Sequence, residues 1–165
     1  MSGEQAVARY VERLRVPWWW WVATAMLAGL FAAELWRGVN TVPAWLPFAL
    51  ALGLAAAGLW WLGRIEIRVT DDELVVDDAR LPLTAIADVV PINAAGRREL
   101  LGPAADPMAF VIQRPWLPTA AQVLLDDPAD PTPYWVISTA RPVELAAAVT
   151  AARAAASSPG GSGRR

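Results

Sequence analysis

The chain has 165 residues, a formal net charge of −2 and a hydrophobic content of 56%. This length allows one domain plus an appendage, and the hydrophobic content is high for a soluble domain of this size. Cysteine, histidine and lysine are absent, because all 14 basic residues are arginine. These absences exclude disulfides, thiolate and imidazole metal sites, Ser-His-Asp triads, Schiff-base lysines and the lysine of a P-loop.

Two apolar segments dominate the first part of the chain. Residues 18–36 contain one acidic residue, Glu34, and no basic residue, and residues 42–62 contain no charge at all. Each segment is long enough to cross a bilayer, whose hydrocarbon core takes about 20 apolar residues in a helix. Because the external loop at residues 37–41 is short, the two helices must be antiparallel neighbours. The sequence therefore predicts a membrane α-helical hairpin with transmembrane helices at 18–36 and 42–62.

Tryptophans mark the ends of both apolar segments. Indole is favoured at a bilayer surface because its ring is apolar and its N–H needs a polar partner. At about 1.5 Å per residue the end tryptophans lie roughly 27 Å and 24 Å apart, close to a hydrocarbon thickness of about 30 Å. We therefore predict eight membrane-interface anchors, namely Trp18, Trp19, Trp20, Trp21, Trp36, Trp45, Trp60 and Trp61.

The arginines predict the orientation of this hairpin. Five of them flank its two open ends, against the single Arg37 in the loop: Arg9, Arg13, Arg15, Arg64 and Arg68. The positive-inside bias then makes residues 1–17 a cytoplasmic segment. We expect a two-span protein of the bacterial plasma membrane with cytoplasmic N and C termini, since an alanine-rich chain with arginine as its only base is typical of a GC-rich bacterial genome. A cleaved signal peptide is the alternative, but its apolar region usually has only about 7 to 15 residues.

Small residues recur at every fourth position in both apolar segments, in the series Ala25, Gly29, Ala33 and the series Ala49, Gly53, Ala57. This spacing allows close approach of helix backbones in a membrane. Gly29 and Gly53 are therefore predicted to be helix-packing residues, either within the hairpin or between copies of the chain. Chance spacing in alanine-rich segments is the alternative.

Residues 64–156 predict a mostly β domain with alternating apolar and polar positions. Four strands are expected as a meander, at residues 64–70, 73–77, 80–83 and 86–92. One or two helical turns are expected within 96–101, followed by strands at 108–113, 122–125 and 134–138. From Pro142 to Ala156 the period is helical, with proline at the first helical position and Glu144 complementing the helix dipole. We expect a barrel or sandwich of about seven strands with one C-terminal capping helix, and a disordered tail at residues 157–165.

Several segments resemble known families. RIEIRVTDDELVVDDARLPLTAI and YWVISTARPVELAAAV resemble bacterial pleckstrin-homology-like (PH-like) domains. Residues 13–153 are similar to an actinobacterial family of two-span membrane proteins catalogued as domain of unknown function 3093 (DUF3093), through RLRVPWWWW, WWLGRIEIRV, LGPAADPMAFVIQRPW and DPADPTPYWVIST. The resemblance implies a membrane location and a PH-like cytoplasmic domain. It brings no activity, cofactor or catalytic residue.

Two groups of side chains in the predicted domain could carry chemistry or binding. Acids gather on the first hairpin, and such oxygen ligands bind Mg²⁺ or Ca²⁺: Asp71, Asp72, Glu73, Asp77 and Asp78. Turns also select Asp, so two solvated β-turns are the preferred interpretation. Arg114 and Trp116 lie in a proline-stiffened connection and are the candidate partner-binding residues, since exposed Trp and Arg are frequent binding anchors. The alternative, which we prefer, is that Trp116 closes one end of the domain.

The charge of the predicted domain bears on its partners. From Val69 to Ala156, twelve acids and six arginines give a net charge of −6. Such a domain is repelled by nucleic acid and by the anionic inner leaflet of the membrane. No nucleic-acid partner is therefore expected, and lipid-headgroup recognition is not expected as the main function.

The predicted function is a non-enzymatic, membrane-tethered protein-interaction or scaffolding module without a cofactor. Its expected partners are the lipid bilayer and a protein of unknown identity, with a homo-oligomer as a further option. One alternative is a metal-dependent enzyme that uses the acidic cluster on a lipid or envelope substrate. Another is an oligomeric channel or transporter component that depends on Glu34, for which we prefer an interface ion pair with Arg37.

Overall fold

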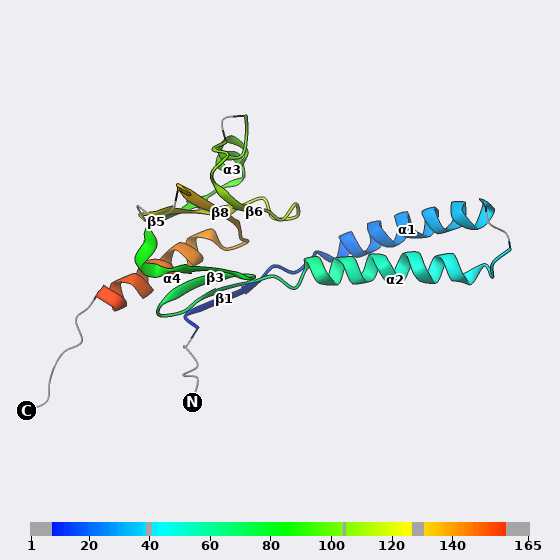
Figure 1. The fold of residues 1–165 in the computed structure, drawn as a ribbon, viewed down its shortest axis with the longest axis horizontal. Helices are drawn as coiled ribbons and strands as arrows, with labels where there is room; N and C mark the ends of the chain where they lie inside the picture. The colour runs from blue at the N-terminus through cyan, green and yellow to red at the C-terminus, as the bar shows by residue number, and fades with distance from the viewer. Residues whose placement is uncertain (1–7, 39–40, 104, 127–130, 158–165) are drawn as a thin grey trace, which may run out of the picture. The chain divides into compact units, whose positions relative to one another are not determined.

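The computed structural model describes residues 8–38, 41–103, 105–126 and 131–157 (Figure 1). The chain divides into two compact units. Residues Arg13–Ile65 form a helical unit, and Met1–Glu12 together with Glu66–Arg165 form a second unit that contains the sheets. The predicted disordered tail lies outside the described residues except for Ser157, as do residues 1–7 of the N-terminal segment and 39–40 of the loop.

Two long helices, α1 (Trp18–Gly38) and α2 (Trp45–Leu62), lie side by side in the helical unit (Figure 1). Their runs of alanine and leucine are strong helix formers. Ala32 of α1 and Leu59 of α2 are buried. By contrast, a Cβ atom added at Gly29 or Gly53 would meet nothing within 4 Å. These two glycines therefore do not bring the helices together within this chain.

Gly63, directly after α2, does allow a close approach. A Cβ atom at this position would lie 3.1 Å from Cγ2 of Val16 and 3.3 Å from the carbonyl oxygen of Leu59. The segment that leads into α1 therefore passes close to the end of α2. The amide of Gly63 donates a hydrogen bond to the carbonyl oxygen of Leu59 at 3.0 Å, which ends the helix.

The first sheet has the strand order β1-β2-β3-β4 and is formed by β1 (Tyr10–Arg13), β2 (Glu66–Val69), β3 (Glu73–Val76) and β4 (Ala79–Pro82). Alternation along β2 and β3 places Ile67, Val69, Leu74 and Val76 on one face, where each is 0% exposed. The meander of β2, β3 and β4 lies where the alternation predicts it. β1 was not predicted, and it comes from the segment that precedes α1.

The second sheet has the strand order β5-β7-β8-β6 and is formed by β5 (Ile86–Ile92), β6 (Phe110–Ile112), β7 (Ala120–Leu125) and β8 (Tyr134–Ser138). β6 and β8 are parallel, whereas β7 is antiparallel to both of its neighbours. A short 3₁₀ helix, η1 (Leu83–Ala85), separates β4 from β5 and buries Leu83. Because of this break, β5 begins a new sheet instead of extending the meander as its fourth strand.

Two helices complete the unit that contains the sheets. α4 (Pro142–Ser157) contacts β5 and β7 of the second sheet and β2 of the first, and lies between the two sheets (Figure 1). Leu145, Val149 and Ala152 form its buried stripe, at the helical spacing that the sequence predicts. α3 (Ala94–Leu100) follows β5, and the Asn93 side chain caps it by accepting hydrogen bonds from the amides of Ala95 and Gly96.

The predicted fold class is wrong. The described residues form two sheets of four strands and four α-helices, not a PH-like barrel of about seven strands with one C-terminal helix. β1 adds a fourth strand to the first sheet, and η1 separates this sheet from β5, the first strand of the second sheet. The strands therefore form two sheets and not one closed barrel. The helical part of the prediction also fails as stated, because among the described residues only α2 is long and apolar enough to cross a membrane. α1 is less apolar because it contains Glu34, Arg37 and five indole N–H groups.

Candidate functional site

The largest candidate surface is the apolar outside of α1 and α2. Met26 and Leu27 of α1 are 71% and 68% exposed, and Leu54 of α2 is 74% exposed. Water-soluble monomers rarely expose contiguous apolar patches larger than a few hundred Å². The arrangement therefore requires a cover, either the hydrocarbon of a bilayer or another apolar surface.

The predicted interface tryptophans lie at the ends of these two helices. Seven of the eight are exposed, and Trp20 is half-buried with its ring centroid 5.5 Å from that of Trp19. The Arg64 guanidinium lies over the Trp61 ring, 5.9 Å from its centroid. Glu34 and Arg37 form the expected pair near the end of α1, with 3.8 Å between Arg37 Nη1 and Glu34 Oε1. Both partners are exposed, so the pair contributes little to stability.

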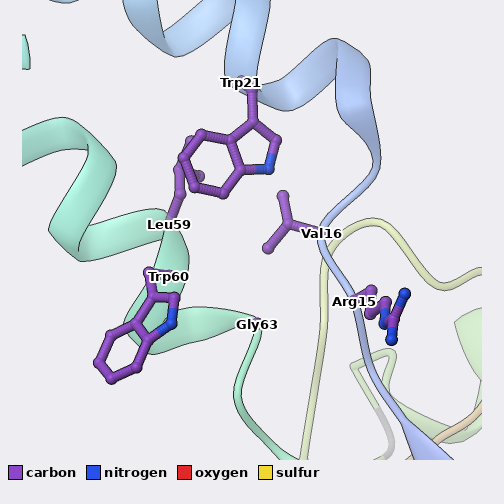
Figure 2. Close-up of a pocket in the computed structure, with 6 residues that line it drawn as sticks. All are labelled: Arg15, Val16, Trp21, Leu59, Trp60 and Gly63. Carbon is purple, nitrogen blue, oxygen red and sulfur yellow. The ribbon is translucent and has the colours of Figure 1, made fainter.

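A cleft of about 210 Å³ opens within the helical unit where α1 begins and α2 ends (Figure 2). It is lined by Arg15, Val16, Trp21, Leu59, Trp60 and Gly63. Figure 2 shows the Trp21 indole over Leu59 and Val16 pointing toward the gap, whereas the Arg15 guanidinium points away from both indoles. The walls are therefore mainly apolar, and the cleft suits a hydrocarbon group. It contains no acid, base or nucleophile that could act on a substrate.

The acidic cluster of the first hairpin forms two turns. Thr70 Oγ1 accepts a hydrogen bond from the amide of Glu73 at 3.1 Å and closes the first turn. Asp71 forms an ion pair with Arg9, and Glu73 Oε1 lies 2.8 Å from Arg80 Nη1. In the second turn Asp77 has a φ of 57°, a conformation that Asp tolerates better than most residues. Across the described residues, no group of three or more acids is placed to hold a metal ion.

A buried carboxylate that the sequence does not predict links β1 to the chain just before α4. Glu12 is 5% exposed. Its Oε2 accepts hydrogen bonds from Tyr10 Oη at 2.8 Å and Thr139 Oγ1 at 2.5 Å, and its Oε1 accepts one from the Ala140 amide at 2.9 Å. Hydrogen bonds to a charged acceptor in a buried site are among the stronger interactions in a protein. The only signal in the sequence is an acid at a position where YVER alternates into the sheet.

Arg141 adds two contacts between the same parts of the chain. Its guanidinium lies over the Tyr10 ring, 5.1 Å from the centroid. Its Nη2 donates a hydrogen bond to the Val11 carbonyl oxygen at 3.2 Å. The N-terminal strand is therefore held to the residues that start α4 by a carboxylate, a phenol and a guanidinium.

This network predicts a specific alkaline instability. Burial, followed by the hydrogen bond to Glu12 and the charge of Glu12, raises the pKa of Tyr10 well above its ordinary value of 10.0. A raised folded-state pKa contributes stability that is complete below the unfolded-state pKa and is lost as the pH rises above it. The chain has no lysine and no cysteine, so no ammonium or thiol side chain masks the effect of Tyr10 at alkaline pH. We expect the free energy of unfolding to fall above about pH 10, and to fall less in Tyr10→Phe.

Denaturant unfolding in mild detergent, followed by tryptophan fluorescence across this pH range, measures the effect. An equal fall in the parent chain and in Tyr10→Phe would contradict it.

The predicted partner-binding residues, Arg114 and Trp116, follow β6 and are both half-buried. The amide of Leu117 donates to the carbonyl oxygen of Arg114 at 3.1 Å, so this segment forms a turn. Arg97 of α3 donates from Nη1 to the Leu117 carbonyl oxygen at 2.9 Å and holds the turn against the helix. Nε1 of Trp116 is buried, which agrees with the alternative that Trp116 closes one end of the domain.

The strand before this turn has an open edge. β6 pairs with β8 alone in the described sheet, so its other edge has no strand partner there. Met108, Phe110 and Val111 are exposed along it, and the Phe110 ring packs against Trp135 with centroids 4.5 Å apart. The exposure of these three residues was not predicted, because a three-residue strand gives no clear alternation. They form the second candidate surface, which we call the β6 edge.

These features define a class of protein: a two-sheet α/β domain interrupted near its N-terminus by a pair of apolar, exposed helices. The family model described as "Protein of unknown function (DUF3093)" matches residues 9–149, and the chain belongs to this family. The family expected from the sequence is thereby confirmed. Comparisons with curated proteins and with solved structures give no match.

Proposed function

We propose that the protein is a two-span integral protein of the bacterial plasma membrane whose two-sheet domain is a non-enzymatic interaction module in the cytoplasm. The observation that carries this proposal is the pairing of β1 with β2. β1 precedes α1 and β2 follows α2, yet the two strands are neighbours in one sheet. Arg9 in front of β1 donates from its amide to the Val69 carbonyl oxygen at 2.8 Å.

Because of this pairing, α1 and α2 must either both cross the bilayer or both remain on one side of it. The chain must leave the sheet before α1 and return to the same sheet after α2. If α2 crosses a bilayer once, α1 has to cross it as well, because otherwise β1 and β2 would lie on opposite sides. The lower apolarity of α1 is compatible with this role, since Glu34 and Arg37 lie at its end and not at its centre.

The dimensions and surface of the helices support the same conclusion. With 21 and 18 residues, α1 and α2 are about 31 Å and 27 Å long, which suits a hydrocarbon core of about 30 Å. Helices satisfy their own backbone hydrogen bonds, as a bilayer interior demands. The exposed leucines then contact lipid hydrocarbon, and the tryptophans at both ends lie at the two interfaces. The arginines that flank the open ends favour cytoplasmic termini.

The proposal assigns no reaction to the domain. Cysteine, histidine and lysine are absent from the chain. Four acids of the first hairpin lie in its turns and Glu73 begins β3, and two of the five, Asp71 and Glu73, are paired with Arg9 and Arg80. This use of the acids favours an interaction module over a metal-dependent enzyme.

We propose that the protein partner binds at the β6 edge, through Met108, Phe110 and Val111 and the adjoining Arg114 and Trp116. An unpaired strand edge offers backbone hydrogen bonds to an added strand, and exposed apolar side chains provide specificity. A second copy of the chain is one partner that the proposal allows. The net negative charge of the domain disfavours nucleic acid as the partner.

Photo-crosslinking in intact membranes tests this surface. A benzophenone amino acid at Met108 should give one adduct of defined mass, whereas the same group at the exposed Asp78 of the first hairpin should give none. Val111→Asp should abolish the Met108 adduct, because it places a charge in the proposed apolar contact. An adduct of twice the chain mass would identify a homo-oligomer. Absence of an adduct from Met108, or one that survives Val111→Asp, would contradict the proposed surface.

A further inference from the structure

Positive charge without a counter-charge gathers around α3 and the turn after β6. Four arginines of the sheet-containing unit form ion pairs with described acids: Arg9, Arg68, Arg80 and Arg141. Arg97, Arg98 and Arg114 form none with any residue that the structure describes. Acids outnumber arginines two to one between Val69 and Ala156, so this lack of pairing is not caused by a shortage of acids.

Two of these arginines line a cavity of about 260 Å³, together with Leu101 and Gln113. Arg97 and Arg98 come from α3, and Gln113 directly follows β6. Arg114 follows directly, and its Nη1 donates a hydrogen bond to the Gln113 carbonyl oxygen at 2.8 Å. Two arginines and a glutamine therefore line the cavity, and a third arginine is bonded to the backbone of that glutamine.

Hydrogen-bond donors are also left over at this place. Nε of Arg97 and Nε of Arg114 are buried, and neither has a hydrogen-bond partner within the described part of the chain. A buried donor without a partner costs about 1 to 3 kcal/mol, and more when it belongs to a charged group. An anion bound beside these arginines would neutralise their charge.

We propose that this cavity binds a phosphate group, carried by a soluble small molecule or by a lipid. The planar guanidinium fork matches phosphate oxygens and forms charge-assisted hydrogen bonds with them. A phosphate monoester carries close to two negative charges at neutral pH, which balances the two arginines in the cavity, whereas a carboxylate carries only one. Leu101 provides an apolar wall for the group to which the phosphate is attached.

This site does not depend on the membrane topology, and it shares with the proposed partner surface only the adjoining Arg114. It also differs from general attraction to an anionic membrane surface, because the domain as a whole is negative and would be repelled. Recognition therefore has to come from the local guanidinium groups. That requirement makes the site testable by single substitutions that change the total charge equally.

Calorimetry on the full-length chain in nanodiscs of neutral lipid tests the proposal. Titrations with inorganic pyrophosphate and with a soluble short-chain phosphatidate probe the two sources of the phosphate group. Arg98→Gln is the informative variant, because Arg98 is exposed and its Nε donates to Ala94 of its own helix, so the fold does not depend on it. Arg80→Gln removes the same charge from a paired arginine of the first hairpin and is the matched control.

We expect saturable binding of at least one probe, weakened about tenfold or more by Arg98→Gln and unchanged by Arg80→Gln. Binding of pyrophosphate would identify a soluble phosphate ligand, and binding of phosphatidate alone would identify a lipid headgroup. No saturable binding of either probe, or equal weakening in both variants, would overturn the proposal.

Discussion

Replacing Glu12 with alanine is expected to lower the free energy of unfolding by about 3 kcal/mol, because three donors lose a buried charged acceptor. The donors are the Tyr10 hydroxyl, the Thr139 hydroxyl and the Ala140 amide, at 2.8, 2.5 and 2.9 Å from the carboxylate. They come from β1 and from the two residues after β8, so the loss also weakens the link between the N-terminal strand and the start of α4, which Arg141 then maintains. Alanine cannot restore any of these bonds.

The control for this change is Glu144→Ala, in the first turn of α4. Glu144 is exposed and forms an ion pair with Arg141 at 3.1 Å, so its removal should cost about 0.5 kcal/mol or less. Denaturant unfolding of full-length chains in the same detergent, followed by tryptophan fluorescence, compares the two variants. Similar losses in Glu12→Ala and Glu144→Ala would show that the Glu12 network does not stabilise the sheet.

Most strands could be predicted from the sequence because their apolar residues alternate. Ile67 and Val69 lie on one face of β2, and Leu74 and Val76 continue that face on β3 after a turn rich in Asp. Pro142 and the stripe that includes Leu145 and Val149 likewise predict α4. In these elements local periodicity and tertiary burial agree, so the pattern is sufficient.

The assembly of the strands could not be predicted in the same way. β1 buries Tyr10 and Glu12, and a buried acid looks like a surface residue until its three donors are known. β6 has three residues and pairs in parallel with β8, although β7 lies between these two strands in the sequence. This crossover has no local sequence signal. These two strands explain why the expected barrel is wrong. β1 joins the first sheet from a position before α1 in the sequence, and β6 changes the strand order of the second sheet.

Some features of the candidate surfaces could likewise be predicted from sequence position, whereas others depend on tertiary packing. The placement of the tryptophans at the helix ends could be predicted from the sequence, because it depends only on position along each helix, and their role as interface anchors stays a prediction. The role expected of Gly29 and Gly53 depends on which helix faces which, and both positions have open space in this chain. The cavity lined by Arg97 and Arg98 depends on the packing of α3 against the turn after β6, through the hydrogen bond from Arg97 to Leu117. A contact over that sequence distance leaves no trace in composition or spacing.

The second large effect expected is an all-or-none difference in chemical labelling across the membrane. If both helices cross the bilayer, the link between them lies outside the cell, and β1 and α4 lie inside. If α2 alone crosses, β1 and the link lie on the same side, opposite to α4. The parent chain has no cysteine, so single cysteines report these positions without background.

Labelling of three single-cysteine variants with a membrane-impermeant maleimide in sealed right-side-out vesicles is therefore the most direct measurement. The variants are Val11→Cys in β1, Thr41→Cys in the link and Ala155→Cys in α4, all at exposed positions. The proposed two-span arrangement predicts that Thr41→Cys is labelled in sealed vesicles, and that Val11→Cys and Ala155→Cys are labelled only after permeabilisation. Labelling of Val11→Cys together with Thr41→Cys in sealed vesicles, or protection of Thr41→Cys, would contradict it.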